Sequence, residues 1–121
     1  MAQFSESSVR AFPCAVALTK GTAVKFSSGR IVAATAGTDK IIGVIDVDND
    51  AGQDAHVRLR SGTGTAIGMA GGTIAVGDAV TATTAGALIA TVTAQNQIVG
   101  YALEAVASGA EFEMMLSTGT V

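Results

Sequence analysis

The segment Gly21-Thr22-Ala23-Val24 returns 56 positions later as Gly77-Asp78-Ala79-Val80. After a slip of one residue the spacing becomes 57, and further matches continue almost to the end of the chain. These matches pair Gly29 with Gly86, Ala33 with Ala90, Ile41 with Ile98, Gly43 with Gly100, Gly52 with Gly109, Leu59 with Leu116, and Gly62-Thr63 with Gly119-Thr120. Most are glycines typical of turns or apolar residues typical of strands. The sequence therefore predicts two copies of one structural unit, at 21–63 and 77–120.

Two segments alternate in the way expected of half-buried β-strands. In 54–60 one face carries Ala55, Val57 and Leu59, and the other carries His56, Arg58 and Arg60. The second copy places Phe112, Met114 and Leu116 inward and Glu111 and Glu113 outward, with Met115 as the outward exception. Because a slip of one residue would turn every core side chain outward, the preserved phase indicates a structural repeat.

The polar residues of the first copy are absent from the second. At the spacing of 57, Arg58 becomes Met115, Asp46 becomes Leu103 and His56 becomes Glu113. The repeat therefore preserves a scaffold, and it gives no sign of a polar site shared by both copies.

The remaining patterns also favour strands. Strands are expected at 14–18, 23–26, 30–35, 41–47 and 73–76, with turns or an exposed loop at 61–72. The segment 101–107 contains helix formers, but its counterpart 44–50 does not, so we predict a strand with an irregular end. We expect an all-β fold, a small β-barrel or β-tulip-like domain at 12–121. It would contain repeat one at about 12–64 and repeat two at about 68–120, after an extended N-terminal arm at 1–11.

Composition narrows the classes of function. Charged residues make up 14 % of the chain, against roughly 25 % in typical soluble domains, so we expect surfaces that have partners. The net charge of −3 argues against nucleic-acid binding. No apolar run is long enough for a membrane span, and the start lacks the pattern of a secretory signal. The single cysteine, Cys14, fits folding in a reducing cytoplasm.

Charge is distributed unevenly between the two copies. All seven basic residues lie in the first 60 positions, whereas the second half carries Asp78, Glu104, Glu111 and Glu113. The asymmetry has two explanations: drift on a solvated surface, or lobes that face different neighbours, as in a head-to-tail ring. On the second explanation, Arg58 and Arg60 pair with Glu111 and Glu113 between subunits or lobes.

No constellation of side chains predicts catalysis, a cofactor or a metal. The run Asp46 to Asp54 begins like a calcium loop, but Ala51 and Val57 stand where glycine and glutamate are needed, so an acidic solvated turn is favoured. His56 and Cys14 are the lone residues of their types and fit a surface strand and a small buried position. No Gly-x-Ser-x-Gly elbow is present, and the glycines at 62–68 match a dinucleotide loop poorly. We predict no catalytic, cofactor-binding or metal-binding residue and no small-molecule substrate.

Short motifs of the second copy resemble a family of tailed-phage capsid decoration, or cement, proteins. They are 76–80, Gly86, 98–105 and Gly109, and the first copy echoes them at 20–25 and 41–44. The resemblance covers about 12–120. It implies a non-enzymatic β module on the outer surface of a phage head, acting as a homotrimer and bridging major capsid proteins. The protein would be made in the host cytoplasm and become part of the virion.

We hypothesise that residues 1–12 contact the capsid by adding a strand to the capsid protein, with Phe4 and Phe12 as apolar anchors. The alternative is a small β-barrel that binds a ligand or receptor on a phage tail or cell surface. Five aromatic residues in total, four Phe and one Tyr, argue against that alternative.

Overall fold

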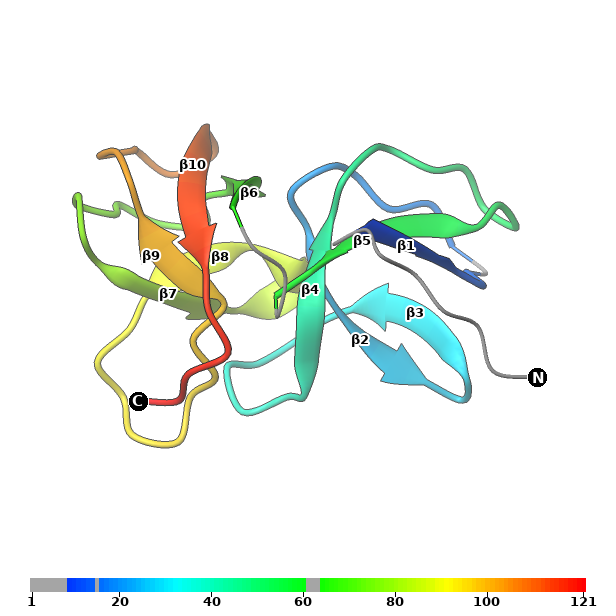
Figure 1. Ribbon diagram of the computed structural model, residues 1–121, viewed down its shortest axis with the longest axis horizontal. Helices are drawn as coiled ribbons and strands as arrows, with labels where there is room; N and C mark the ends of the chain where they lie inside the picture. The colour runs from blue at the N-terminus through cyan, green and yellow to red at the C-terminus, as the bar shows by residue number, and fades with distance from the viewer. Residues whose placement is uncertain (1–8, 15, 61–63) are drawn as a thin grey trace.

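The protein consists of two five-stranded antiparallel sheets that lie side by side, one built from each half of the chain (Figure 1). The computed structural model describes residues 9–14, 16–60 and 64–121. The expected all-β class is confirmed: these residues form ten strands and one short 3₁₀ turn, Thr84–Gly86. Among them, no helix is long and apolar enough to cross a membrane.

Each half forms a lobe with the same strand order. The first lobe has the order β1-β5-β4-β2-β3, from β1 (Val9–Phe12), β2 (Ala23–Ser27), β3 (Arg30–Ala33), β4 (Ile41–Ile45) and β5 (Ala55–Leu59). The second lobe has the order β6-β10-β9-β7-β8, from β6 (Thr65–Met69), β7 (Ala79–Ala82), β8 (Leu88–Ala90), β9 (Gly100–Ala102) and β10 (Glu111–Leu116). The predicted duplication is therefore present in the structure.

The sheets are curled but are not closed barrels. A single parallel bridge, Cys14 with Ile31, draws together the two ends of the first sheet, and Ala70 with Leu88 does the same in the second. These bridges occupy matching positions of the repeat, so the two sheets share their curled shape as well as their strand order.

Two pairs of matched glycines are favoured by backbone conformation or by a close approach between strands. Gly21 and Gly77 have φ angles of 88° and 85°, in the left-handed region that favours glycine. At Gly43 a Cβ would overlap the carbonyl oxygen of Arg58, and at Gly100 it would overlap that of Met115. Strands β4 and β9 therefore lie close to β5 and β10 because both copies keep glycine there.

Two apolar cores result from the alternation in the strands. In β10 the burial pattern alternates as expected, with Phe112, Met114 and Leu116 inside. One core lies within the first lobe and includes Val24, Ile31, Ile45 and Val57. The other is shared: Ala23, Ala34, Ile41 and Val44 of the first lobe pack with Leu88, Val99, Phe112 and Met114 of the second. The opposite faces of β2 and β4 are thus buried in different cores.

Several expected boundaries differ from the structure. The predicted loop at 61–72 contains β6, in which Gly68 is required because a Cβ would meet Leu88 and Phe112. Residues 9–11 of the predicted arm belong to β1 and pair with β5. The segments 14–18 and 73–76 make only isolated bridges. In the first of them, Cys14 pairs with Ile31 and Leu18 pairs with Asn49, so each partner is contacted at a single residue.

We expect Gly43→Ala and Gly100→Ala each to lower the free energy of unfolding by about 2–3 kcal/mol, because the new methyl group must push apart two hydrogen-bonded strands. Gly72→Ala is the matched control, since its Cβ would meet only Ile89 Cγ2, at 3.6 Å. Urea unfolding of the three variants measures the effect. Equal stability of all three would contradict the close-approach argument.

Candidate interaction surfaces

Two residues of the acidic run, Asp46 and Asp48, and the single cysteine, Cys14, make local contacts within the first lobe. Asp48 Oδ1 accepts a hydrogen bond from the Lys20 amide at 2.7 Å, and Asp46 Oδ1 lies 3.1 Å from Arg58 Nη2. Cys14 is buried, and its thiol donates to the Ile31 carbonyl at 3.4 Å. Within 9–14, 16–60 and 64–121, no group of three or more His, Cys, Asp or Glu could hold a metal ion.

Arg60 ties the first lobe to the second. Its Nη1 donates to the Ile98 carbonyl at 3.1 Å, and its Nη2 donates to Gln97 Oε1 at 2.7 Å and to the Thr118 carbonyl at 3.2 Å. All three acceptors belong to the second lobe. Burial of the guanidinium lowers the pKa of Arg60 below its ordinary value. Arg60 therefore contacts the second lobe through carbonyl and amide oxygens.

The other residues predicted to pair have different partners within the chain. Arg58 contacts Asp46, while Glu113 Oε2 accepts from Thr65 Oγ1 at 2.8 Å. Glu111 lies 4.0 Å from Lys20 Nζ, across the two lobes. The structure does not bring Arg58 or Arg60 to Glu111 or Glu113 within one chain, and their pairing between subunits stays a prediction.

Of the two predicted capsid anchors, Phe4 lies outside the described residues. Phe12 ends β1 and packs against the core of the first lobe. Its ring meets that of Phe26 edge to face, with centroids 5.3 Å apart, and the Arg10 guanidinium lies 5.0 Å from its centroid. Phe26 remains 50 % exposed, so this end of the first lobe presents an aromatic surface beside a cation.

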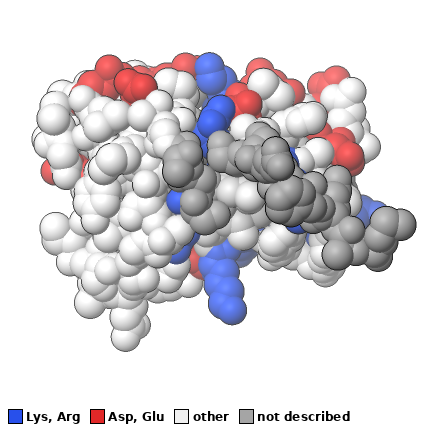
Figure 2. Space-filling model, in the orientation of Figure 1, with Lys and Arg blue, Asp and Glu red and all other residues white. Residues whose placement is uncertain are grey.

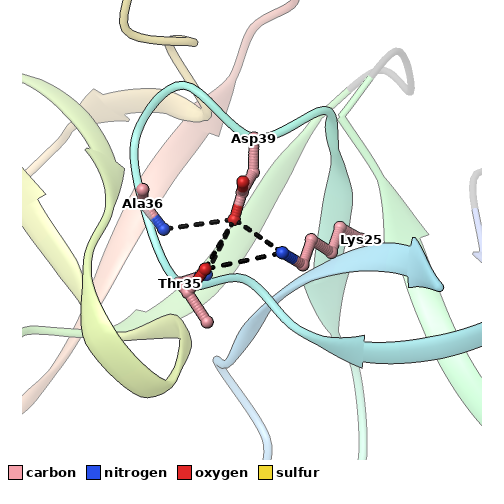
Figure 3. Close-up of polar contacts among 4 residues, drawn as sticks. All are labelled: Lys25, Thr35, Ala36 and Asp39. Atoms are coloured by element: carbon pink, nitrogen blue, oxygen red, sulfur yellow. Dashed lines mark hydrogen bonds and ion pairs between the residues drawn. The ribbon is translucent and has the colours of Figure 1, made fainter.

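A turn after β3 is held by one carboxylate (Figure 3). Asp39 Oδ2 accepts hydrogen bonds from the amides of Thr35 at 2.9 Å and Ala36 at 3.1 Å, and lies 3.1 Å from Lys25 Nζ. The Thr35 amide, followed by Lys25, lowers the pKa of Asp39 to about 2. The turn reaches the second lobe, because the Gly37 carbonyl accepts from the Gln97 amide at 2.7 Å.

The same outward positions carry opposite chemistry in the two lobes. The Arg58 and Asp46 ion pair of the first lobe corresponds in the repeat to Met115 and Leu103 of the second, which are 49 % and 45 % exposed. In Figure 2, acidic side chains gather along the upper edge of both lobes, over the β4–β5 and β9–β10 connections, while the lower part of the second lobe shows no charge. The second lobe therefore exposes two apolar side chains, Leu103 and Met115, that are close to Glu104 and Glu113 in the chain.

An open hollow of about 420 Å³ lies on the second lobe. It is lined by two short segments and one aromatic ring, namely Gly77 to Ala79, Ala90 to Val92, and Tyr101. Val92 is 93 % exposed, and Asp78 is the one charged residue among those in the lining. The sequence did not single out this hollow, although the Gly77 to Val80 repeat segment was the available signal.

We expect Arg60→Met to lower the free energy of unfolding by about 2 kcal/mol, because two partly buried acceptors and one exposed acceptor lose a charged donor. Lys20→Met is the matched control. It also spans the lobes, but its pair with Glu111 is long and about half exposed, so its effect should stay below about 0.5 kcal/mol. Thermal unfolding of both variants measures the difference. Equal losses would show that Arg60 does not join the lobes in this way.

The turn at Asp39 predicts a dependence of stability on pH. Because the pKa is depressed in the folded protein, the carboxylate stabilises the fold fully above its ordinary value of 3.8 and loses this effect as the pH falls through about 2. Asp39→Asn should therefore be less stable than the original protein near neutral pH, and the gap should close on acidification. Urea unfolding at several pH values tests this, and a gap that is constant from neutral pH to about pH 2 would contradict it.

Comparison with known proteins places this architecture. The model of the phage cement protein family matches residues 9–117, which include all ten strands. Comparison with curated protein sequences gives no match. Among solved structures, the crystal structure of the head fiber gp8.5 N base in bacteriophage phi29 has a TM-score of 0.71 at 21 % identity, covering 93 % of this chain and 98 % of that one, and shares the fold. The chain therefore belongs to the phage cement protein family and is a capsid-associated structural protein of a phage.

Proposed function

We propose that the protein binds the outer surface of an assembled phage head and stabilises it by bridging neighbouring major capsid proteins, without catalysing a reaction. The observation that carries this proposal is the family match across both lobes, residues 9–117. The exposed apolar positions of the second lobe support it, since Leu103, Met115 and Val92 stand in water on a chain with few charges.

Stabilisation would follow from mass action. A protein that binds the assembled shell, and binds the free capsid subunits less well, shifts the equilibrium toward the shell by RT ln(1 + [L]/Kd) for each site. Many equivalent sites on one head multiply this effect, so each contact can be weak. We further propose that the protein acts as a homotrimer on the outside of the virion after synthesis in the host cytoplasm.

The N-terminal arm is our proposed capsid contact, with Phe4 and Phe12 as anchors. Strand β1 lies at the edge of the first sheet and pairs on one side with β5. Because an added strand joins a sheet at its edge, the edge position of β1 supports strand addition as the mode of capsid contact. Phe12, at the far end of β1, is held in place by its contact with Phe26.

We expect the full chain to bind undecorated phage heads and to raise the temperature at which they release DNA. Removing residues 1–8 should reduce binding at least about tenfold while leaving thermal unfolding of the free protein unchanged, because β1 and its pairing with β5 remain. Co-sedimentation with heads measures the binding. Phe12→Leu separates the aromatic anchor from the arm, since leucine can still fill the apolar position.

Two outcomes would count against the proposal in different ways. Full binding by the chain without residues 1–8 would reject the arm as the contact and leave head binding in place. A full chain that neither binds heads nor changes their thermal stability would reject the proposed function itself.

A further inference from the structure

The contact that joins the two lobes has two complementary sides. On the first lobe it uses the small residues Thr22, Ala23 and Ala34, together with Val44, and the last three are at most 1 % exposed. On the second lobe it uses the turn at Gly86, where a Cβ would overlap Thr22 Cγ2 and the Ala23 carbonyl. The joint between the lobes is therefore the close contact of the turn at Gly86 with Thr22 and Ala23.

The first-lobe side of this joint recurs on the second lobe, where part of it is more exposed: Gly77 is exposed, and Asp78, Ala79 and Tyr101 are half-buried. In the repeat, Gly21 to Ala23 corresponds to Gly77 to Ala79, the segment 33–35 to Ala90 to Val92, and Val44 to Tyr101. These are the residues that line the hollow of about 420 Å³. Ala23 and Val44 are at most 1 % exposed, whereas their counterparts in the hollow, Ala79 and Tyr101, are half-buried. Thr91, the counterpart of Ala34, is buried.

The second-lobe side of the joint recurs on the first lobe, where it is exposed. The turn at Gly86 corresponds to the tip of the β2–β3 hairpin at Gly29, where nothing lies within 4 Å of a Cβ position. Phe26 and Arg30 flank this tip and are exposed. The hairpin and the segment leading into β7 lie at opposite ends of the long axis of the molecule (Figure 1).

Charge favours the match between these two ends. Asp78 is the charged residue of the hollow, and in the repeat it takes the place of Thr22, which lies against the Gly86 turn. Arg30 directly follows Gly29 at the hairpin tip. If the joint were repeated between molecules, Arg30 of one would lie near Asp78 of the next, an opposite-charge contact that suits specific association.

We propose that the hollow at Gly77 to Ala79, Ala90 to Val92 and Tyr101 receives the β2–β3 hairpin of a second copy of this chain, repeating between molecules the contact that joins the lobes. Such a contact is head-to-tail, so it closes into a ring or continues as a filament according to its rotation. The inference rests on the self-association part of the proposed function and not on capsid binding.

Sedimentation velocity over a range of concentrations tests the proposal. The original protein should self-associate. Ala90→Trp, which fills the hollow at an exposed position, should raise the dissociation constant at least about tenfold. Ala107→Trp is the matched control, because Ala107 is exposed on the same lobe and does not line the hollow. The proposal would be overturned if Ala90→Trp and Ala107→Trp had the same dissociation constant for self-association.

A charge exchange tests the proposed contact directly. Arg30→Glu and Asp78→Arg should each weaken association about tenfold at low salt, and the double variant should regain most of the loss. The Arg30 and Asp78 contact would be overturned if the double variant self-associated no more tightly than the single variant with the weaker association. Asp78 Oδ2 also accepts a hydrogen bond from the Ala75 amide, so the thermal unfolding of each variant is measured first. If Asp78→Arg lowers the unfolding temperature, Asp78→Asn takes its place as the single variant.

Binding of Ala90→Trp to undecorated heads separates this inference from the proposed function. An original protein that stays monomeric at every concentration but decorates heads would overturn the inference and leave the proposed head binding standing. Self-association weakened by Ala90→Trp together with an absence of head binding would support the inference and reject the proposed function.

Discussion

The shared apolar core between the lobes is the constraint on which the rest of the structure depends. Strands β2 and β4 bury one face inside the first lobe and the other against the second, so Ala23 and Val44 must be small or compact. Arg60 closes the rim of this contact with hydrogen bonds to the backbone of the second lobe. Because one core serves both halves, neither lobe has a complete apolar interior without the other, and the two should unfold together.

The duplication explains why some residues persist and others change. The retained glycines are fixed by backbone geometry that no other residue satisfies, as Gly43 and Gly100 show at matching close approaches. Outward positions carry no such requirement, and there the Arg58 and Asp46 pair corresponds to Met115 and Leu103. The second lobe thereby exposes apolar side chains at the positions where the first carries a half-buried ion pair.

The sequence was informative where periodicity and glycine position decide structure. Both alternating strands, the repeat and the all-β class follow from it, since a buried face requires a strict phase. The sequence prediction was wrong at β6. The glycines at 64 and 68 suggested a loop, whereas Gly68 lies in a strand because a Cβ there would collide with the side chains of Leu88 and Phe112. The sequence also did not indicate the partners of Arg60, since they depend on how one lobe sits on the other, or the hollow, since it depends on how segments within the second lobe pack.

The confinement of basic residues to the first lobe has a consequence for proteolysis. Trypsin cleaves after lysine and arginine, and the last such residue is Arg60, whose side chain is held in the joint between the lobes. The entire second lobe therefore contains no tryptic site, even in loops as exposed as the one at Val92. A protein that displayed this lobe to an environment rich in trypsin-like proteases would keep its outward surface intact while cleavage was confined to the other half.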